Sequence, residues 1–136
     1  YFNWVVPQDW SIKRYPKQKW LLLEKKIKLA YPKYKVIWQK RRDNLKQLFS
    51  DIKKSKIVIS TIGLGSHIGM LFNKDLLLLC GPTFFDEIKL YQKAKIIKTK
   101  KFCSIHKKKL NIKSKNCNCM DGLNNKKIFN ELKKVI

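Results

Sequence analysis

Two short apolar runs constrain the fold of this chain more than any other feature. Residues 57–61 (Ile-Val-Ile-Ser-Thr) are mostly β-branched, and residues 76–80 (Leu-Leu-Leu-Leu-Cys) are apolar at every position. Each run has the length of a strand and is followed closely by glycine, at Gly63 and Gly81. A strand that is apolar on both faces is typical of the centre of a parallel sheet covered by helices on both sides. The two runs therefore predict a buried parallel sheet.

Other segments alternate between short apolar runs and helical spacing. Further strands are expected at residues 2–6, 34–38 and around 96–97. Helices are expected from Pro16 through Ala30, from a cap at Asp43 or Asn44 through Ile52, and at residues 66–72, 86–91 and 125–136. Strands that alternate with helices form βαβ units. The pattern predicts one α/β domain over residues 1–136, a doubly wound parallel sheet with helices on both faces. A lysine-rich loop that carries cysteines is expected within residues 98–123.

Composition and processing signals exclude several classes of protein. The chain is 44% hydrophobic and 12% aromatic, which is unlike a disordered linker. No stretch approaches the roughly 18 apolar residues that a membrane helix needs. No signal peptide is recognisable, and the opening Tyr-Phe-Asn-Trp without a start Met suggests a piece of a longer protein. Without an export signal we expect a reducing cytoplasm, so the four cysteines, Cys80, Cys103, Cys117 and Cys119, are not expected to form a disulfide framework.

The charge of the chain favours an anionic partner. There are 32 basic and 9 acidic residues, which gives +23. Residues 1–68 carry 16 basic and 4 acidic residues, and residues 69–136 carry 16 and 5, so the surplus is not a tail. Nucleic acid, nucleotide phosphates and an acidic membrane are all suitable partners. Only Arg14, Arg41 and Arg42 are arginine, the residue on which nucleic-acid surfaces usually depend. Two interpretations remain open: the positive charge serves to bind a partner, or it reflects a lysine-rich composition that has no function.

Three loops that follow predicted strands carry residues suited to an anion. Ligands of parallel sheets bind beyond the carboxyl ends of the strands. Glycine lets backbone amides approach a phosphate closely, and residues at a helix N-terminus favour negative charge. The candidate binding residues are Lys13, Arg14, Gly63, Gly65, Ser66, His67, Gly81 and Thr83. The alternative interpretation is turn glycines and a helix cap without any ligand.

In this order, the loops resemble those of glycosyltransferase family 9, the ADP-heptose:lipopolysaccharide heptosyltransferase type. Lys13-Arg-Tyr-Pro16 is similar to the family's Lys-(Arg/His)-Trp-Pro, and Thr61-Ile-Gly-Leu-Gly-Ser-His67 resembles its Asp-(Thr/Ser)-Gly-x-x-His loop. Cys80-Gly-Pro-Thr83 resembles its Phe/Tyr-Gly-Pro-Thr, and Cys119-Met120 resembles a Cys-Met pair that many members carry before the last helix. The similarity extends over nearly the whole chain and corresponds to the C-terminal half of these enzymes.

The resemblance implies a fold and an activity. The chain would be the Rossmann-like donor half of a GT-B enzyme, which transfers a heptose-like sugar from an ADP-sugar with inversion. The acceptor would be lipopolysaccharide or another cell-surface glycan, and a peripheral position at the inner face of the inner membrane would follow. Lys13 would contact the phosphates, while Ser66, His67 and Thr83 would line the donor cleft. The acceptor contacts and the base would lie in an N-terminal half outside this sequence, so this half alone is expected to be inactive.

The chain departs from the family pattern at three places. Ser60-Thr61-Ile62 stands where the family has an Asp before Thr/Ser-Gly, and one extra residue lies between Gly63 and His67. A Gly-rich loop and a further helix, which the family has between the positions of Trp38 and Asp43, are absent. These departures keep a second class open, a basic nucleic-acid or ribosome-associated binding module with an enzyme-like fold.

The cysteine-bearing loop allows a metal site as an alternative. Cys103, His106, Cys117 and Cys119 provide four soft ligands, the number that tetrahedral zinc takes. The Cys-x-Cys spacing is tighter than the usual two-residue gap, so we expect thiols without metal and no cofactor. The surrounding lysines of residues 93–115 have no acidic neighbour. They could contact an anionic membrane face or lipid A phosphates, or they could simply be solvated.

Overall fold

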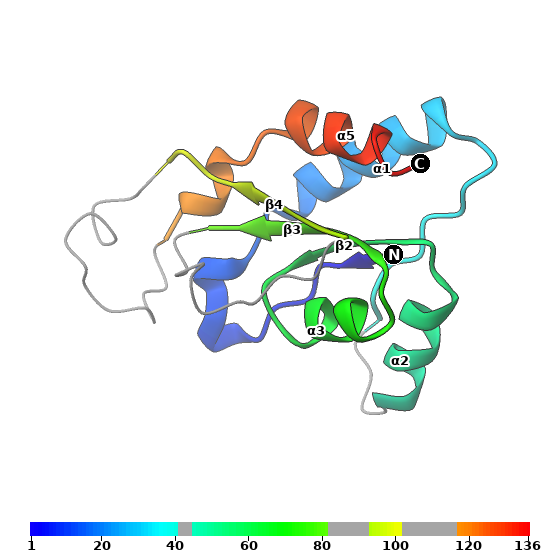
Figure 1. The fold of residues 1–136 in the computed structure, drawn as a ribbon. Coiled ribbons are helices and arrows are strands. Elements are labelled where there is room, and N and C mark those ends of the chain that lie inside the picture. The colour runs from blue at the N-terminus through cyan, green and yellow to red at the C-terminus, as the bar shows by residue number, and fades with distance from the viewer. Residues whose placement is uncertain (41–44, 82–92, 102–116) are drawn as a thin grey trace.

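A computed structural model describes residues 1–40, 45–81, 93–101 and 117–136 (Figure 1). The strands are β1 (Phe2–Asn3), β2 (Ile57–Thr61), β3 (Asp75–Cys80) and β4 (Ala94–Lys98). The α-helices are α1 (Lys17–Ala30), α2 (Leu45–Lys54), α3 (Leu64–Leu71) and α5 (Asn125–Lys133). Two 3-10 helices, η1 (Gln8–Lys13) and η2 (Cys119–Gly122), complete the described elements. All four strands are parallel and lie in the order β1-β2-β3-β4, which confirms the predicted α/β, Rossmann-like class.

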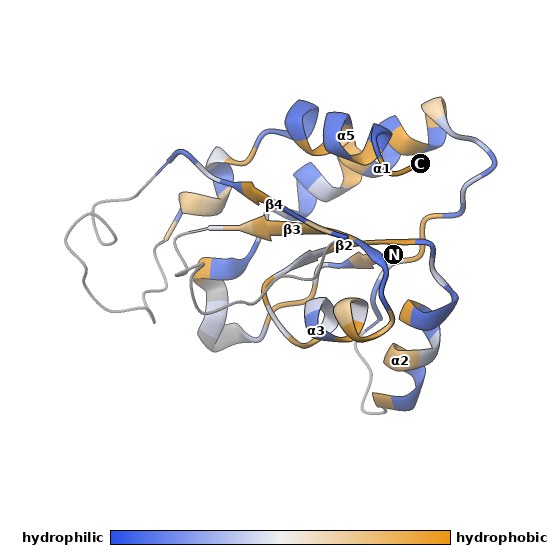
Figure 2. Ribbon diagram, in the orientation of Figure 1, coloured by the Kyte–Doolittle hydropathy of each residue, from blue (hydrophilic) through white to orange (hydrophobic). Residues whose placement is uncertain are grey.

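The helices form a layer on each face of the sheet. Helices α1 and α5 lie on one face, and α2 and α3 lie on the other (Figure 1). Alternate residues of a strand point to opposite faces. Ile57, Ile59, Leu77, Leu79 and Ile97 therefore pack in one core cluster with residues of α1 and α5. Val58 and Leu76 pack in a second cluster with residues of α2 and α3. Figure 2 shows apolar colouring along much of β3 and on parts of α1 and α5, whereas apolar and hydrophilic residues both occur along β4.

The segment predicted as a strand at residues 34–38 is not one. It forms an isolated parallel bridge between Phe2 and Trp38, with hydrogen bonds from Phe2 N to Ile37 O (2.8 Å) and from Gln39 N to Phe2 O (2.9 Å). Because β1 has only two residues, it offers little backbone for further pairing. The chain therefore passes from β1 to this segment on one side and then returns to β2 on the other side of β1. The carboxyl ends of β1 and β2 mark the topological switch point, where doubly wound sheets bind their ligands.

Several helix boundaries in the structure differ from the predicted ones. Helix α3 begins at Leu64 rather than at Ser66, and α5 ends at Lys133 rather than at Ile136. The 3-10 helices η1 and η2 form in stretches whose sequence predicts loops. The helix expected at residues 86–91 lies outside the described residues.

Helices α1 and α5 are joined by polar contacts across more than a hundred residues of sequence. The Tyr15 hydroxyl donates to Asn125 Oδ1, and Asn125 Nδ2 donates to Lys19 O at 2.8 Å. Lys19 Nζ in turn donates to Leu123 O at 3.1 Å. The first third of the chain is thus fixed to its last helix.

Candidate functional site: the carboxyl edge of the sheet

A buried polar pair marks the switch point between β1 and β2. Asn3 is 5% exposed, and its Nδ2 donates to Ser60 Oγ at 2.9 Å. Ser60 Oγ donates onward to Thr61 O at 2.6 Å. Among the described residues, Asn3 Oδ1 has no hydrogen-bond partner. A Cβ placed on Gly65 would lie 2.3 Å from Asn3 Cγ and Oδ1, so only glycine lets the first turn of α3 pack here.

The start of α3 is organised by Ser66. Gly63 N donates to Ser66 Oγ at 3.1 Å, and Ser66 Oγ donates to Gly63 O at 2.7 Å. Ser66 is therefore the third residue of the helix rather than its N-cap, and it is buried. Gly63 occupies the cap position and has no side chain, so the Ser66 hydroxyl makes the bonds that a capping side chain would otherwise make. His67 is exposed, and the space that a Cβ on Gly63 would take is open. The hydroxyl of Ser66 is engaged in the helix start.

A second group lies at the carboxyl ends of β3 and β4. Gly81 directly follows β3, and a Cβ there would lie 2.6 Å from Met120 Sδ and 3.4 Å from Ile12 O. Gly81 therefore permits η1 and η2 to meet over the end of β3. Burial raises the pKa of the Cys80 thiol to about 12, and the charges of Lys98 and Lys13 act in the opposite direction. Two ammonium groups are thus close enough to the end of β3 to influence its last residue.

The structure brings the described candidate residues to one edge of the sheet, in two groups. Gly63, Gly65, Ser66 and His67 follow β2, and Lys13 and Gly81 gather at the end of β3. The ends of β2 and β3 are neighbours, since Thr61 pairs with Leu79. Arg14 is exposed next to Lys13, and Thr83 lies outside the described residues.

Two residues of this edge, Asn3 and Lys98, are not among the binding residues predicted from the three loops, although Lys98 belongs to the lysines of residues 93–115. Asn3 is a polar residue inside a short apolar run, which is an available signal for a special position. Lys98 directly follows the apolar pair Ile96-Ile97, so it occupies the end of a strand as the other candidates do. Lys13 lies with its Nζ 4.4 Å from the centroid of the Trp10 ring, and Trp10 is 40% exposed. The edge therefore offers an aromatic surface beside its ammonium groups.

The structure does not assemble a metal site from the residues it describes. Cys103 and His106 lie outside them, and Cys119 is buried in the core with its backbone N donating to Cys117 Sγ at 3.5 Å. Within residues 1–40, 45–81, 93–101 and 117–136, no three His, Cys, Asp or Glu residues are grouped to hold an ion. In the same ranges, no helix combines the length and apolar character needed to cross a bilayer.

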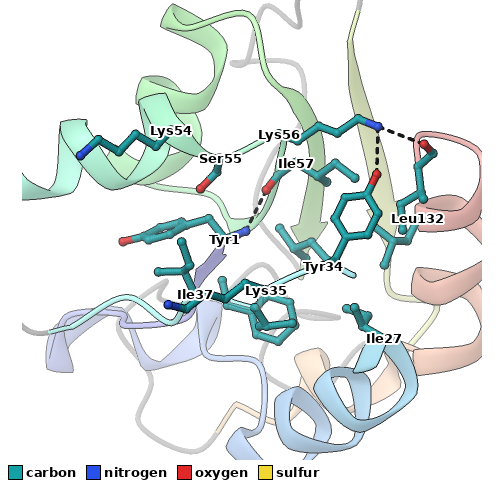
Figure 3. A pocket seen from close by; sticks show the side chains of 14 residues that line it. Tyr1, Ile27, Tyr34, Lys35, Ile37, Lys54, Ser55, Lys56, Ile57 and Leu132 are labelled. Atoms are coloured by element: carbon teal, nitrogen blue, oxygen red, sulfur yellow. Dashed lines mark hydrogen bonds between the residues drawn. The ribbon is translucent and has the colours of Figure 1, made fainter. Parts of the chain in front are cut away.

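A hollow of about 230 Å³ lies at the opposite, amino edge of the sheet (Figure 3). Its walls are mainly apolar, with Phe2, Ile57 and Leu132 among them. Lys56 Nζ at its rim donates to Tyr34 Oη and to Ile136 O, both at 3.0 Å. The remaining hydrogen bond drawn in Figure 3 runs from the amino group of Tyr1 to Ile57 O at 2.8 Å. None of the candidate residues lines this hollow.

Comparisons with protein-family models, with curated proteins and with solved structures give no match. The chain is accordingly classified by its architecture, a parallel α/β sheet of the Rossmann-like type.

Proposed function

We propose that the carboxyl edge of this sheet binds the diphosphate of a nucleotide-sugar, and that the chain is the donor half of an inverting glycosyltransferase. One observation carries the proposal. Loops that follow three different strands bring Lys13, the glycine-framed start of α3 and Gly81 to the same edge, beside the switch point. The resemblance of these loops to glycosyltransferase family 9 adds the expected donor, an ADP-sugar carrying a heptose-like sugar.

The chemistry required of this half is stabilisation of the leaving group. An acceptor hydroxyl attacks the anomeric carbon, a new C–O bond forms, and the bond from that carbon to the diphosphate oxygen breaks with its electron pair on the nucleotide. The ammonium groups of Lys13 and Lys98 stabilise the negative charge that develops on the leaving diphosphate, and the backbone amides at the start of α3 favour an anion. The acceptor's proton leaves to a base on the facing half. No residue of this chain is assigned as that base.

A nucleic-acid or ribosome-associated module is the second candidate. The net charge of +23 favours it, as does the exposed Trp10 ring with Lys13 against it. Proteins that bind single strands combine basic grooves with aromatic rings on which bases stack. The arginine-poor composition speaks against base-specific readout.

A titration at two salt concentrations separates the candidates. ADP should shift the amide resonances of residues 13–14, 63–67 and 81, and this binding should survive physiological salt because the amides and helix terminus are weakly screened. Binding of a short RNA should weaken steeply with salt. Lys13→Ala should abolish the ADP shifts, while Lys33→Ala, an exposed lysine of the turn after α1, should not. Tight, salt-resistant RNA binding without ADP shifts would reverse the assignment.

A further inference from the structure

The positive charge of the described helices is concentrated in one layer. Residues 17–30 and 125–134, which include α1 and α5, contain nine lysines and two glutamates. Both glutamates are paired with lysine of the same layer, Glu24 with Lys28 at 2.9 Å and Glu131 with Lys134 at 2.7 Å. The opposite layer, α2 and α3, contains three lysines and one aspartate. The α1/α5 face is therefore strongly and selectively cationic.

Large apolar side chains lie on this same face. Helix α1 buries Trp20, Leu23 and Ile27 against the sheet, as expected for a covering helix. It also exposes three leucines to solvent, Leu21 (41%), Leu22 (55%) and Leu29 (74%). Leu22 and Leu29 are seven residues apart and so lie on one side of the helix, with Lys25 and Lys26 between them in sequence. Figure 2 shows the resulting mixture of apolar and polar bands along α1.

We propose that the α1/α5 face docks on an anionic phospholipid bilayer. Leu22 and Leu29 enter the boundary between headgroups and acyl chains, and the lysines of α1 and α5 contact lipid phosphates. A helix that lies in the membrane plane uses this combination of leucine and lysine. Lysine stems are long enough to reach the headgroups while neighbouring leucines are inserted. The inference is independent of the proposed nucleotide site, which lies at the carboxyl edge.

Other occupants fit the same surface less well. A second copy of the chain would bring two cationic faces together. Nucleic acid would leave the leucines without a role, since bases stack on aromatic rings rather than on aliphatic side chains. The shallow hollow on this face is lined by α1 residues alone, Leu21, Glu24, Lys25, Lys28 and Leu29. With no second wall it forms no groove for a partner helix, whereas a fluid bilayer adapts to a convex ridge.

The test measures partition of the purified chain onto sedimented vesicles. Vesicles of phosphatidylcholine alone are compared with vesicles of phosphatidylcholine and phosphatidylglycerol. The double variant Leu22→Gln/Leu29→Gln is compared with Leu45→Gln/Leu71→Gln, whose leucines are 57% and 69% exposed on the other layer. Lys25→Gln/Lys26→Gln is likewise compared with Lys53→Gln/Lys54→Gln, an exposed pair on α2. Glutamine is a good helix former, and circular dichroism checks that each variant is folded.

We expect binding to the mixed vesicles only. The α1 leucine variant should lose roughly tenfold or more in partition coefficient, and its matched control about twofold or less. Each α1 lysine should contribute roughly fivefold, and the α2 pair much less. Equal losses in the α1 variants and in their matched controls on α2 and α3 would overturn the proposal, as would equal binding to both kinds of vesicle. Failure to bind the vesicles would also overturn the proposal. If an acidic protein or RNA then covered Leu22 and Leu29, that molecule would be the partner of this face instead of a bilayer. ADP titration of the same variants reports on the nucleotide site separately.

Discussion

Asn3 of β1 lies directly against Gly65 of α3, at a distance that leaves no space for a side chain on residue 65. A Cβ there would be 2.3 Å from both Cγ and Oδ1 of Asn3. Because Asn3 also donates to Ser60 on β2, one amide side chain fixes the relative positions of β1, β2 and α3. The geometry of the switch point depends on this contact.

Gly65→Ala should destabilise the fold, because the buried Asn3 side chain must shift to admit the new methyl group. Overpacking of this kind costs about 1–3 kcal/mol, more than alanine gains over glycine in helix propensity. Gly63→Ala is the matched control, since its Cβ would have nothing within 4 Å. Denaturant unfolding measures both free energies of unfolding. Equal values for the two variants would contradict the close contact.

Removal of the Asn3 side chain should relieve that clash. In an Asn3→Ala background, the additional cost of Gly65→Ala should fall by about 1 kcal/mol or more, as for residues in direct contact. Asn3→Ala by itself should destabilise the fold, because it also leaves Ser60 without its buried donor. A double-mutant cycle from unfolding curves gives the coupling energy. Strict additivity would show that the two residues do not touch.

Ser66→Ala should weaken the start of α3. The substitution removes the acceptor of Gly63 N and the donor to Gly63 O together. A cap interaction of this kind is worth about 1 kcal/mol. The free energy of unfolding should fall by that amount, and hydrogen exchange of the first turn of α3 should accelerate. Unchanged exchange there would mean that the hydroxyl does not organise the turn.

Cys80 should resist alkylation in the folded protein. Burial raises the pKa of its thiol to about 12, so almost no thiolate is present between about pH 7 and 9. The folded-state pKa of Cys80 lies above the ordinary value of 9.0. The neutral thiol therefore contributes to the free energy of unfolding below pH 9, and this contribution is lost as the pH rises toward 12. Mass spectrometry after iodoacetamide treatment should find Cys117, which is partly exposed, modified well before Cys80. In denaturant the two rates should converge, and rapid folded-state labelling of Cys80 would contradict its burial.

Residues 1–136 alone should transfer no sugar from an ADP-sugar donor. The proposed function gives this chain the donor's diphosphate and leaves the base and the acceptor contacts to a facing half. Release of ADP and formation of glycosylated acceptor are the quantities to measure. Robust transfer by this chain would contradict the division of the active site between two halves.

The sheet could be predicted where residues are apolar on both faces, as at 57–61 and 76–80, because only a central parallel strand buries both. The same reasoning failed at 34–38, since strand-like composition does not report that the neighbouring β1 is too short to pair with it. The start of α3 was placed late because Gly63-Leu-Gly carries no side-chain capping signal, whereas Ser66 does. The candidate residues reached the carboxyl edge because the topology of parallel strands sends their following loops there. The contacts of Asn3 and the position of Lys98 depend on packing between distant segments, which periodicity does not encode.

The hydrogen bonds that join Tyr15 and Lys19 to Asn125 have a consequence for how the chain is made. Their partners are 110 and 106 residues apart, and Asn3 and Ser60 are separated by 57. Contacts so distant in sequence slow folding, because a long loop must close before they form. During synthesis, Trp20, Leu23 and Ile27 leave the ribosome long before Ile128 and Leu132, which share their core cluster. The core cluster under α1 therefore stays incomplete until α5 has been made, an interval in which a chaperone would protect the exposed apolar surface from aggregation.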